Sequence, residues 1–304
     1  MSDAPVSGDL NVRWIHGSRN RRTNTDPPMQ VHAYDPHTYI LRQNKAVNYE
    51  APFLYLLFGN ERALLWDTGA TAAPDLFPLR ATIDGMVDEW LKFHPQDNYE
   101  LIVAHSHGHG DHVAADPQFA DRPHTVLVEA DLDRIKSFYG FTQWPYQVVQ
   151  LDLGGRVLDI TGIPGHDTRS LAVFDPWSGF LLTGDTVYPG RLYAREPGPF
   201  AMSMEHLAEF ADARPVTHVM GCHIEQSRTP RRDYPIGCTY QPKEPPLQMT
   251  MEQLHAVRDA TRAVRDRPGI HVFDDFTIYN GSGPSAGMAA RVLLARARNA
   301  VSPP

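Results

Sequence analysis

The chain has 304 residues, of which 42% are hydrophobic and 21% charged, and its formal net charge is −8. This is the composition of an ordinary globular protein, and the negative charge argues against a nucleic-acid-binding face, which normally shows as clustered Lys and Arg. The two cysteines are too few for a disulfide framework, no segment approaches the roughly eighteen apolar residues of a membrane span, and the N-terminus lacks an apolar signal segment. We therefore expect a cytoplasmic protein that binds neither nucleic acid nor membrane.

Short apolar segments separated by turns fill the first third of the chain. Strands are predicted, in chain order, at 10–16, 38–43, 53–58, 63–66 and 101–104, with a loop at 18–28. Both faces of the 53–58 segment are apolar, which is typical of a buried strand. Ile83, Val87 and Trp90 recur at helical spacing, so an amphipathic helix is predicted over 78–93.

The same pattern continues to the C-terminus. Further strands are predicted at 125–128, 148–151, 157–160, 171–174, 180–182 and 218–220. Beyond a proline-rich segment at 226–249, the capping-box pair Thr250 and Gln253 opens a helix, followed by a strand at 270–279 and a terminal helix at 286–300. Many short strands in two runs, each followed by helices, predict two packed sheets with helices outside.

The domain organisation follows from this pattern. Residues 1–9 are expected to be a flexible N-terminus, and 10–304 a single domain. Within that domain, 226–249 forms a proline-rich loop, and the residues beyond it form a helix–strand–helix extension.

Residues 106–112, Ser-His-Gly-His-Gly-Asp-His, follow directly on the predicted strand at 101–104. The two glycines let the backbone turn tightly enough for the ligand-type side chains to converge. Imidazole and carboxylate are ligands of zinc, iron and manganese. The four candidates, His107, His109, Asp111 and His112, exceed the three protein ligands that a catalytic zinc usually takes, so two neighbouring metals are predicted.

Three later positions repeat this arrangement. His166, Asp185 and His223 each stand at the tip of a turn that contains glycine and follows an apolar strand. Functional side chains are commonly carried on loops at one edge of a rigid sheet scaffold. We therefore expect these three residues to join the histidine loop in one site.

The order of these motifs resembles that of the metallo-β-lactamase superfamily. The resemblance rests on the Asp67-Thr68-Gly69 turn, the His-x-His-x-Asp-His loop, Pro-Gly-His, Thr-Gly-Asp and a final Gly-x-His, and it covers about residues 10–225. It implies an α+β fold, an αβ/βα sandwich of two mixed β-sheets with helices on the outer faces. It also implies a dinuclear metal centre at one edge.

Carried over to this sequence, the resemblance implies a role for each ligand candidate. His107, His109 and His166 would hold the first metal, Asp111, His112 and His223 the second, and Asp185 would bridge them. The cofactors would be two divalent ions, zinc first, with iron or manganese possible. Asp67 would accept the second N–H of a metal-bound imidazole and orient it, the alternative being a simple turn aspartate.

Several neighbouring residues are interpreted differently. Asp167, Thr168, Arg169 and Ser170 replace the Thr-Pro-Gly-Ser-like segment that often follows Pro-Gly-His in the family, and Arg169 has no assigned role. Cys222, beside His223, is expected to be a buried small residue and not a metal ligand. His105 is expected to form hydrogen bonds within the structure.

The placement of Tyr188, three residues beyond Asp185, resembles the quorum-quenching lactonase branch, where a tyrosine just after the bridging aspartate contacts the substrate carbonyl. A packed loop tyrosine is an equal alternative. Arg191, Tyr193 and Tyr240 are candidates for the substrate-pocket wall. The predicted strand at 270–279 argues mildly against the helical glutathione-binding appendage of the glyoxalase II branch.

The predicted function is a dinuclear metallohydrolase whose bridging hydroxide attacks an ester, lactone or thioester of a small molecule. Asp111 would carry the proton to the leaving group, and Tyr188 would help to stabilise the oxyanion. The main alternative is a mononuclear iron oxidoreductase of the persulfide dioxygenase type. A β-lactamase and a non-catalytic metal-binding protein are less favoured, and the oligomeric state is not readable from the sequence.

Overall fold

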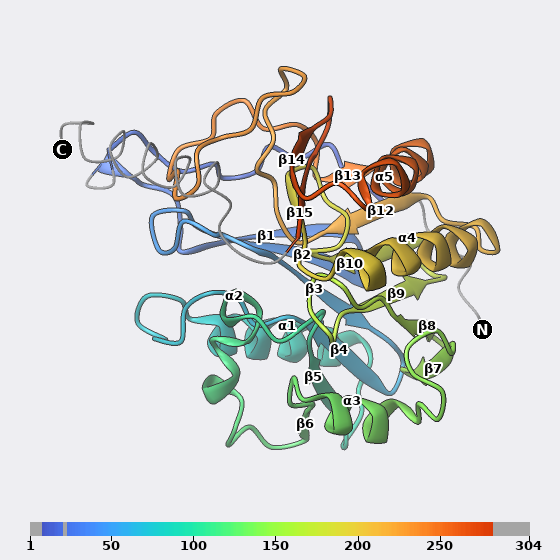
Figure 1. Cartoon of the computed structure of the whole chain (residues 1–304). Helices are drawn as coiled ribbons and strands as arrows, with labels where there is room; N and C mark the ends of the chain where they lie inside the picture. The colour runs from blue at the N-terminus through green and yellow to red at the C-terminus, as the bar shows by residue number, and fades with distance from the viewer. Residues whose placement is uncertain (1–7, 21–22, 282–304) are drawn as a thin grey trace.

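Two β-sheets packed face to face form the centre of the molecule in the computed structural model, which describes residues 8–20 and 23–281 (Figure 1). Each sheet has six strands, in the orders β1-β2-β3-β4-β5-β6 and β13-β12-β10-β9-β8-β7. A smaller sheet of three strands has the order β11-β15-β14. Helices lie on the two outer sides of the paired sheets (Figure 1).

The first sheet comes from the N-terminal part of the chain. Its strands are β1 (Met29–Asp35), β2 (Thr38–Gln43), β3 (Phe53–Phe58), β4 (Arg62–Trp66), β5 (Glu100–Ala104) and β6 (Thr125–Leu127). The strands β1 to β4 are antiparallel neighbours, whereas β4, β5 and β6 pair in parallel. A parallel pair needs a crossover connection, and α1 (Leu79–Phe93) supplies it between β4 and β5. Its apolar residues Ile83, Val87 and Trp90 are buried, as their helical spacing predicts.

The second sheet and the small sheet follow. The strands are β7 (Val149–Asp152), β8 (Val157–Gly162), β9 (Leu171–Asp175), β10 (Phe180–Gly184), β11 (Arg191–Ala194), β12 (His218–Gly221), β13 (Gln248–Met249), β14 (Gly269–Val272) and β15 (Thr277–Asn280). The remaining helices are α2 (Gly110–Val113), a 3-10 turn (Asp116–Gln118), α3 (Leu132–Tyr139), α4 (Pro197–Asp212) and α5 (Met251–Val264). Thr250 caps α5 in the predicted capping box with Gln253.

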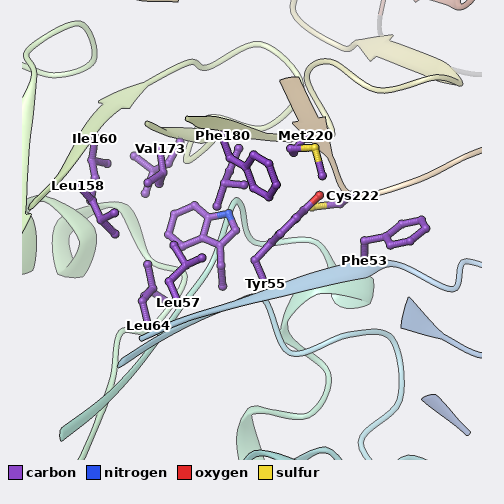
Figure 2. Packing of buried hydrophobic residues seen from close by; sticks show 14 of the residues in the cluster. Phe53, Tyr55, Leu57, Leu64, Leu158, Ile160, Val173, Phe180, Met220 and Cys222 are labelled. Carbon is purple, nitrogen blue, oxygen red and sulfur yellow. The ribbon is translucent and has the colours of Figure 1, made fainter. Parts of the chain in front are cut away.

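The main core fills the space between the two large sheets (Figure 2). Phe53, Tyr55 and Leu57 of β3 lie on one side of it, and Val173 and Phe180 of the second sheet lie on the other. The Tyr55 hydroxyl donates a 2.6 Å hydrogen bond to the carbonyl of Gly221, which ties β3 to the end of β12. Two further apolar clusters lie under α1 and under α4 and α5. The predicted sandwich of two mixed sheets with outer helices is confirmed.

A buried ion pair of the second sheet is also hydrogen-bonded to the first sheet, away from the loops described below. The side chains of Arg156 and Asp175 are both 0% exposed. The Arg156 guanidinium also donates to the carbonyls of His37 (2.8 Å) and Phe58 (2.9 Å). Burial acts to raise the pKa of Asp175, but the Arg156 charge and hydrogen bonds lower it overall, so this carboxyl group is ionised.

The prediction of a strand at 10–16 is wrong. The strand lies at β1 instead, and 10–16 forms no strand, although Trp14 packs edge-on against Phe53 with ring centroids 5.0 Å apart. Hydrophobic alternation identified 10–16 because Leu10, Val12 and Trp14 all pack against the core. Strand β1 was missed because it is an edge strand whose middle residues are exposed or only partly buried.

The prediction of one strand over 270–279 is also wrong, because the segment is the hairpin β14–β15. The pair Asp274 and Asp275 lies between its strands, and aspartate favours turns because its side chain can bond to nearby backbone. Strand β15 pairs in parallel with β11, so the hairpin becomes part of the small sheet.

Three further elements, α3, α4 and β11, were not predicted from the sequence. The predicted helix at 286–300 lies outside the described residues. Within the described part of the chain, no helix has the length and apolar character needed to cross a membrane.

Candidate metal centre and adjoining cavity

The seven ligand candidates lie on loops that leave the ends of strands in both large sheets. His107 and His109 follow β5, Asp111 and His112 lie in α2, and His166, Asp185 and His223 follow β8, β10 and β12. The turn after β10 requires glycine, because Gly184 has a φ of +53° and an added Cβ would lie 2.7 Å from the Cβ of Ser106. The sequence therefore allows the Asp185 loop to approach the histidine loop closely.

Four of the seven side chains form the first ligand group. The Nδ1 atom of His109 lies 2.8 Å from Nε2 of His107 and 3.0 Å from Nε2 of His166. The Oδ2 atom of Asp185 lies 3.9 Å from the same atom of His107 and 3.6 Å from that of His166. Three imidazole nitrogens and one carboxylate oxygen thus converge on one point.

The second ligand group lies on the other side of Asp185. Its Oδ1 atom is 3.5 Å from Nε2 of His112 and 3.3 Å from Nε2 of His223. The Oδ2 atom of Asp111 lies 3.5 Å and 3.3 Å from those two nitrogens. The structure therefore brings together all seven predicted ligand candidates, and the two oxygens of Asp185 face different groups.

The residues of both groups fit divalent metal ions. In each group, the ligand atoms lie within 4.8 Å of one another. Among the described residues, Oδ1 of Asp185 and Nε2 of His112 are buried and have no hydrogen-bond partner. Leaving such atoms unsatisfied is costly, and a bound cation would satisfy both. Imidazole and carboxylate are suitable donors for zinc, iron and manganese.

The outward-facing nitrogens of the imidazoles have their own acceptors. The Nδ1 atom of His112 lies 2.9 Å from Oδ2 of Asp67, and those of His166 and His223 lie 3.2 Å from the carbonyls of Tyr193 and Glu50. A neutral imidazole that donates N–H on one side presents a lone pair on the other. These acceptors therefore orient the nitrogens that face the two groups as metal ligands.

Asp67 is the centre of this supporting network. It is fully buried with a left-handed φ of +70°. Besides His112, it accepts from the amide of Ser106 (2.7 Å) and from the hydroxyl of Ser106 (2.8 Å). That hydroxyl lies 3.0 Å from Nδ1 of His107. Asp67 thus contacts one ligand imidazole directly and a second through Ser106, which is more than a turn aspartate would do.

The burial expected of Cys222 and the hydrogen bonding expected of His105 are confirmed. That Cys222 is not a metal ligand stays a prediction, because Asp67, His112 and Cys222 form a third group that could hold an ion. Cys222 is fully buried, and its thiol donates to Asp67 at 3.3 Å. Burial raises its pKa, which keeps the thiol protonated. The Nδ1 atom of His105 lies 3.2 Å from the carbonyl of His112, and its Nε2 atom lies 3.2 Å from Asp116.

The two groups differ in their electrostatics. Burial lowers the pKa of His107 and lowers that of His166 to about 4, so both imidazoles are neutral, as metal ligands must be. In the second group burial also acts to lower the pKa of His223, but Asp185 and Asp111 outweigh it and raise that pKa to about 9. These carboxylates therefore attract positive charge to the second group.

Asp167 and Arg169, which follow Pro164-Gly165-His166, form an ion pair beside the histidine loop. Arg169 donates from Nε to one oxygen of Asp167 (2.8 Å) and from a terminal nitrogen to the other (2.7 Å). The Oδ2 atom of Asp167 lies 3.6 Å from Nε2 of His109. Arg169 also covers Gly108, where an added Cβ would lie 2.3 Å from the guanidinium carbon. The pair therefore packs against the turn that carries His107 and His109.

A cavity of about 720 Å³ adjoins both ligand groups. Its wall includes His109, Asp111, His166, Asp185 and His223. The rest of the wall comes from β11, the β14–β15 hairpin and scattered loop residues: Glu50, Tyr188, Arg191, Tyr193, Arg195, Glu225, Ile236, Gly269, Ile270, Tyr279, Asn280 and Gly281. The candidate metal centre therefore opens into a space large enough for a small-molecule substrate.

Tyr188 and two of the three predicted pocket-wall residues, Arg191 and Tyr193, line this cavity. The buried Tyr188 hydroxyl is within hydrogen-bond distance of the Arg191 carbonyl and of Glu225, so its single proton already has acceptors. Arg191 is ion-paired with Glu225, and its Nε lies 3.3 Å from the hydroxyl of Tyr193. Donation by Tyr188 to a substrate oxyanion would require its hydroxyl to turn away from these acceptors, and this role stays a prediction.

Tyr240 does not line the cavity. It lies beside His16, with ring centroids 5.8 Å apart, and its backbone bridges to Gly17. The proline-rich segment instead contributes Ile236 to the cavity wall. Tyr240 was chosen for its residue type and loop alone, which did not specify the direction of its side chain.

Comparison with known proteins decides the family. The sequence model of the metallo-beta-lactamase superfamily matches residues 50–214, more than half of the chain. The chain belongs to the metallo-β-lactamase superfamily. The matched range contains six of the ligand candidates, and only His223 lies beyond it. The superfamily membership and the ligand groups together imply divalent metal ions.

Curated relatives and solved structures agree with this assignment. The hydroxyacylglutathione hydrolases of Synechococcus sp. strains JA-3-3Ab and JA-2-3B'a(2-13) are each 28% identical, over 172 and 170 residues. These matches cover 53% and 52% of this chain, and 63% and 62% of the relatives, so the chain spans less than two thirds of their length. The TMB-1 structure (TM-score 0.51, 13% identity) and a metallo-beta-lactamase from Pontibacter korlensis (0.50, 13%) share the fold, covering 79% and 77% of this chain and 99% of each of theirs.

Several residues of this superfamily site were not identified from the sequence. Glu50 and Ser106 support ligand imidazoles, and Glu225 and Arg195 line the cavity. Glu225 stands two residues beyond His223 and Ser106 directly before His107, so proximity to a ligand was an available signal. Glu50 and Arg195 belong to no recognisable motif, and only the fold brings them to the site.

Proposed function

We propose that this superfamily member is a dinuclear metal-dependent hydrolase that cleaves an ester, lactone or thioester bond of a small molecule. The observation that carries the proposal is the sharing of Asp185 between two ligand groups that adjoin one cavity of about 720 Å³. The names of the Synechococcus relatives support a thioester in particular, because a hydroxyacyl group joined to glutathione forms one.

The seven ligand candidates would hold two divalent ions. Zinc is the favoured metal, and iron and manganese are the alternatives. Such ions supply a nucleophilic water with a pKa near neutrality and a Lewis acid for the substrate carbonyl. The chain's own part is to fix the geometry. Asp67, Tyr193 and Glu50 hold the ligand imidazoles from behind, so their metal-facing nitrogens are already aligned.

Asp111 is the ligand candidate best placed to move a proton. Its side chain is 23% exposed, the largest value among the seven, and it lines the cavity. A carboxylate at the border between the site and a bound substrate can receive a proton from the water and pass it to the leaving group. Tyr188 would contribute to oxyanion stabilisation when its hydroxyl turns away from the Arg191 carbonyl and Glu225.

A substrate screen tests the proposal. We expect the purified, zinc-loaded protein to hydrolyse at least one compound from a panel of thioesters, aryl esters and lactones, with β-lactams and phosphoesters as comparison classes. Activity should disappear after removal of the metals with a chelator and return when zinc is added. If protein that contains one iron ion per chain consumes oxygen when it is given a persulfide, the proposal is contradicted and the dioxygenase alternative is favoured.

A further inference from the structure

One cation of the cavity wall has no role in the site described so far. Arg195 directly follows β11, and its side chain is exposed and lines the cavity. Two backbone hydrogen bonds fix its position: its amide donates to the carbonyl of Tyr193 (3.0 Å), and the next amide, that of Glu196, donates to the carbonyl of Gly165 (2.9 Å). Arg195 is thereby anchored beside the loop that carries His166.

The charges of the wall leave Arg195 available to a ligand. The other arginine of the wall, Arg191, is buried and ion-paired with Glu225 and Asp233. The carboxylates of Asp111 and Asp185 face the ligand imidazoles. Within residues 8–20 and 23–281, by contrast, the guanidinium of Arg195 takes part in no hydrogen bond or ion pair.

The position of Arg195 also defines an orientation for a substrate. Arg195 lies on the side of the first ligand group, because the amide of the residue after it is bonded to the carbonyl of Gly165, directly before His166. Ile236 and Ile270 supply an apolar part of the same wall. A molecule in the cavity thus meets a free cation, the metal-binding side chains and an apolar surface.

We propose that Arg195 binds a carboxylate of the substrate, and that the enzyme therefore prefers esters or thioesters that carry a negative charge near the scissile bond. This inference rests on the proposed function and names the substrate class of the same site. A guanidinium suits a carboxylate because its planar fork of N–H donors can form two parallel hydrogen bonds to it. Arg195 is accordingly a specificity-determining residue.

Two matched substrates and three variants test the proposal. The substrates are a succinyl thioester and its terminal methyl ester, which differ in the free carboxylate. For Arg195→Gln, we expect kcat/KM on the succinyl thioester to fall about tenfold, which is near the smallest loss expected when a hydrogen bond to a charged group is removed. We expect kcat/KM on the methyl ester to change by less than about twofold. Arg195→Lys should lose less, because it retains the charge without the fork.

Arg134→Gln is the matched control, because it removes an exposed arginine of α3 that does not line the cavity. We expect it to change neither substrate by more than about twofold. Equal losses on both substrates in Arg195→Gln, or no loss on either, would overturn the inference.

A binding measurement makes the inference testable without turnover. Calorimetry on the zinc-loaded protein would compare two thioether analogues, one ending in a carboxylate and one in the corresponding amide. We expect Arg195→Gln to weaken the carboxylate about tenfold and to leave the amide unchanged. If the wild-type protein hydrolyses no compound of the screening panel, the proposed function fails, but this comparison still decides the role of Arg195. Binding of the carboxylate that does not depend on Arg195 would refute that role.

Discussion

Replacing Asp185 with alanine is expected to remove nearly all hydrolytic activity, and more of it than the replacement of Asp67. Asp185 presents one oxygen to each ligand group, so under the proposed function the variant would lose a ligand at both metals. Asp67 contacts the site only through His112 and Ser106, and the loss of such a supporting contact typically costs about 10–100-fold. The measurement is kcat/KM on one substrate from the screen, with the metal content of each protein determined in parallel.

Asp212→Ala is the control for removal of a carboxylate, because this residue lies outside the cavity on α4 and pairs with His255 at the surface. It should retain full activity and metal content. Melting temperatures of all three variants separate a loss of function from a loss of fold. If Asp185→Ala and Asp67→Ala turn over the substrate equally well, Asp185 does not hold both ions.

Replacing Arg156 with methionine is expected to lower the free energy of unfolding by about 3–5 kcal/mol, the usual cost of breaking a buried ion pair by removing one partner. The variant leaves Asp175 fully buried without its counter-ion. It also removes the donors to the carbonyls of His37 and Phe58, which lie on the first sheet or directly beside it. Urea unfolding followed by circular dichroism gives the change directly.

The matched control is Arg262→Met, which breaks the exposed pair with Glu205 on the surface of α4 and α5. Exposed pairs contribute at most about 1 kcal/mol, so this variant should unfold close to the wild type. The double variant Arg156→Met/Asp175→Leu should recover part of the lost stability, because it removes the uncompensated charge. If the Arg156→Met protein is as stable as the Arg262→Met protein, the buried pair and the hydrogen bonds of Arg156 to the first sheet do not stabilise the fold.

The ligand candidates could be identified from the sequence because each carries its signal within a few residues. An apolar strand, a glycine and a histidine or aspartate follow one another at His166, Asp185 and His223, and after β5 the glycine lies between His107 and His109. Strand ends of a sandwich meet at its edge, so the local pattern was sufficient to predict that these side chains gather there. The network behind them was not predictable in full, because Glu50 supports His223 across a large sequence separation and through its backbone carbonyl.

The cavity wall, too, could be predicted only in part from the sequence. Tyr188, Arg191 and Tyr193 follow Asp185 closely and were found from that proximity. The β14–β15 hairpin reaches the cavity only because β15 pairs in parallel with β11, a long-range contact that hydrophobic alternation does not encode. Similarly, 10–16 shows the alternation of a strand, but that pattern reports burial of one face and not hydrogen bonding to a neighbour.

The central claim is a dinuclear centre, and the number of metal ions per chain tests it most directly. The protein would be purified without chelator and analysed by elemental analysis, and metal-free protein would be titrated with zinc while activity is followed. Two ligand groups that share Asp185 predict close to two ions per chain, with full activity only after both are bound. A reproducible content of one ion per chain with full activity would contradict the account.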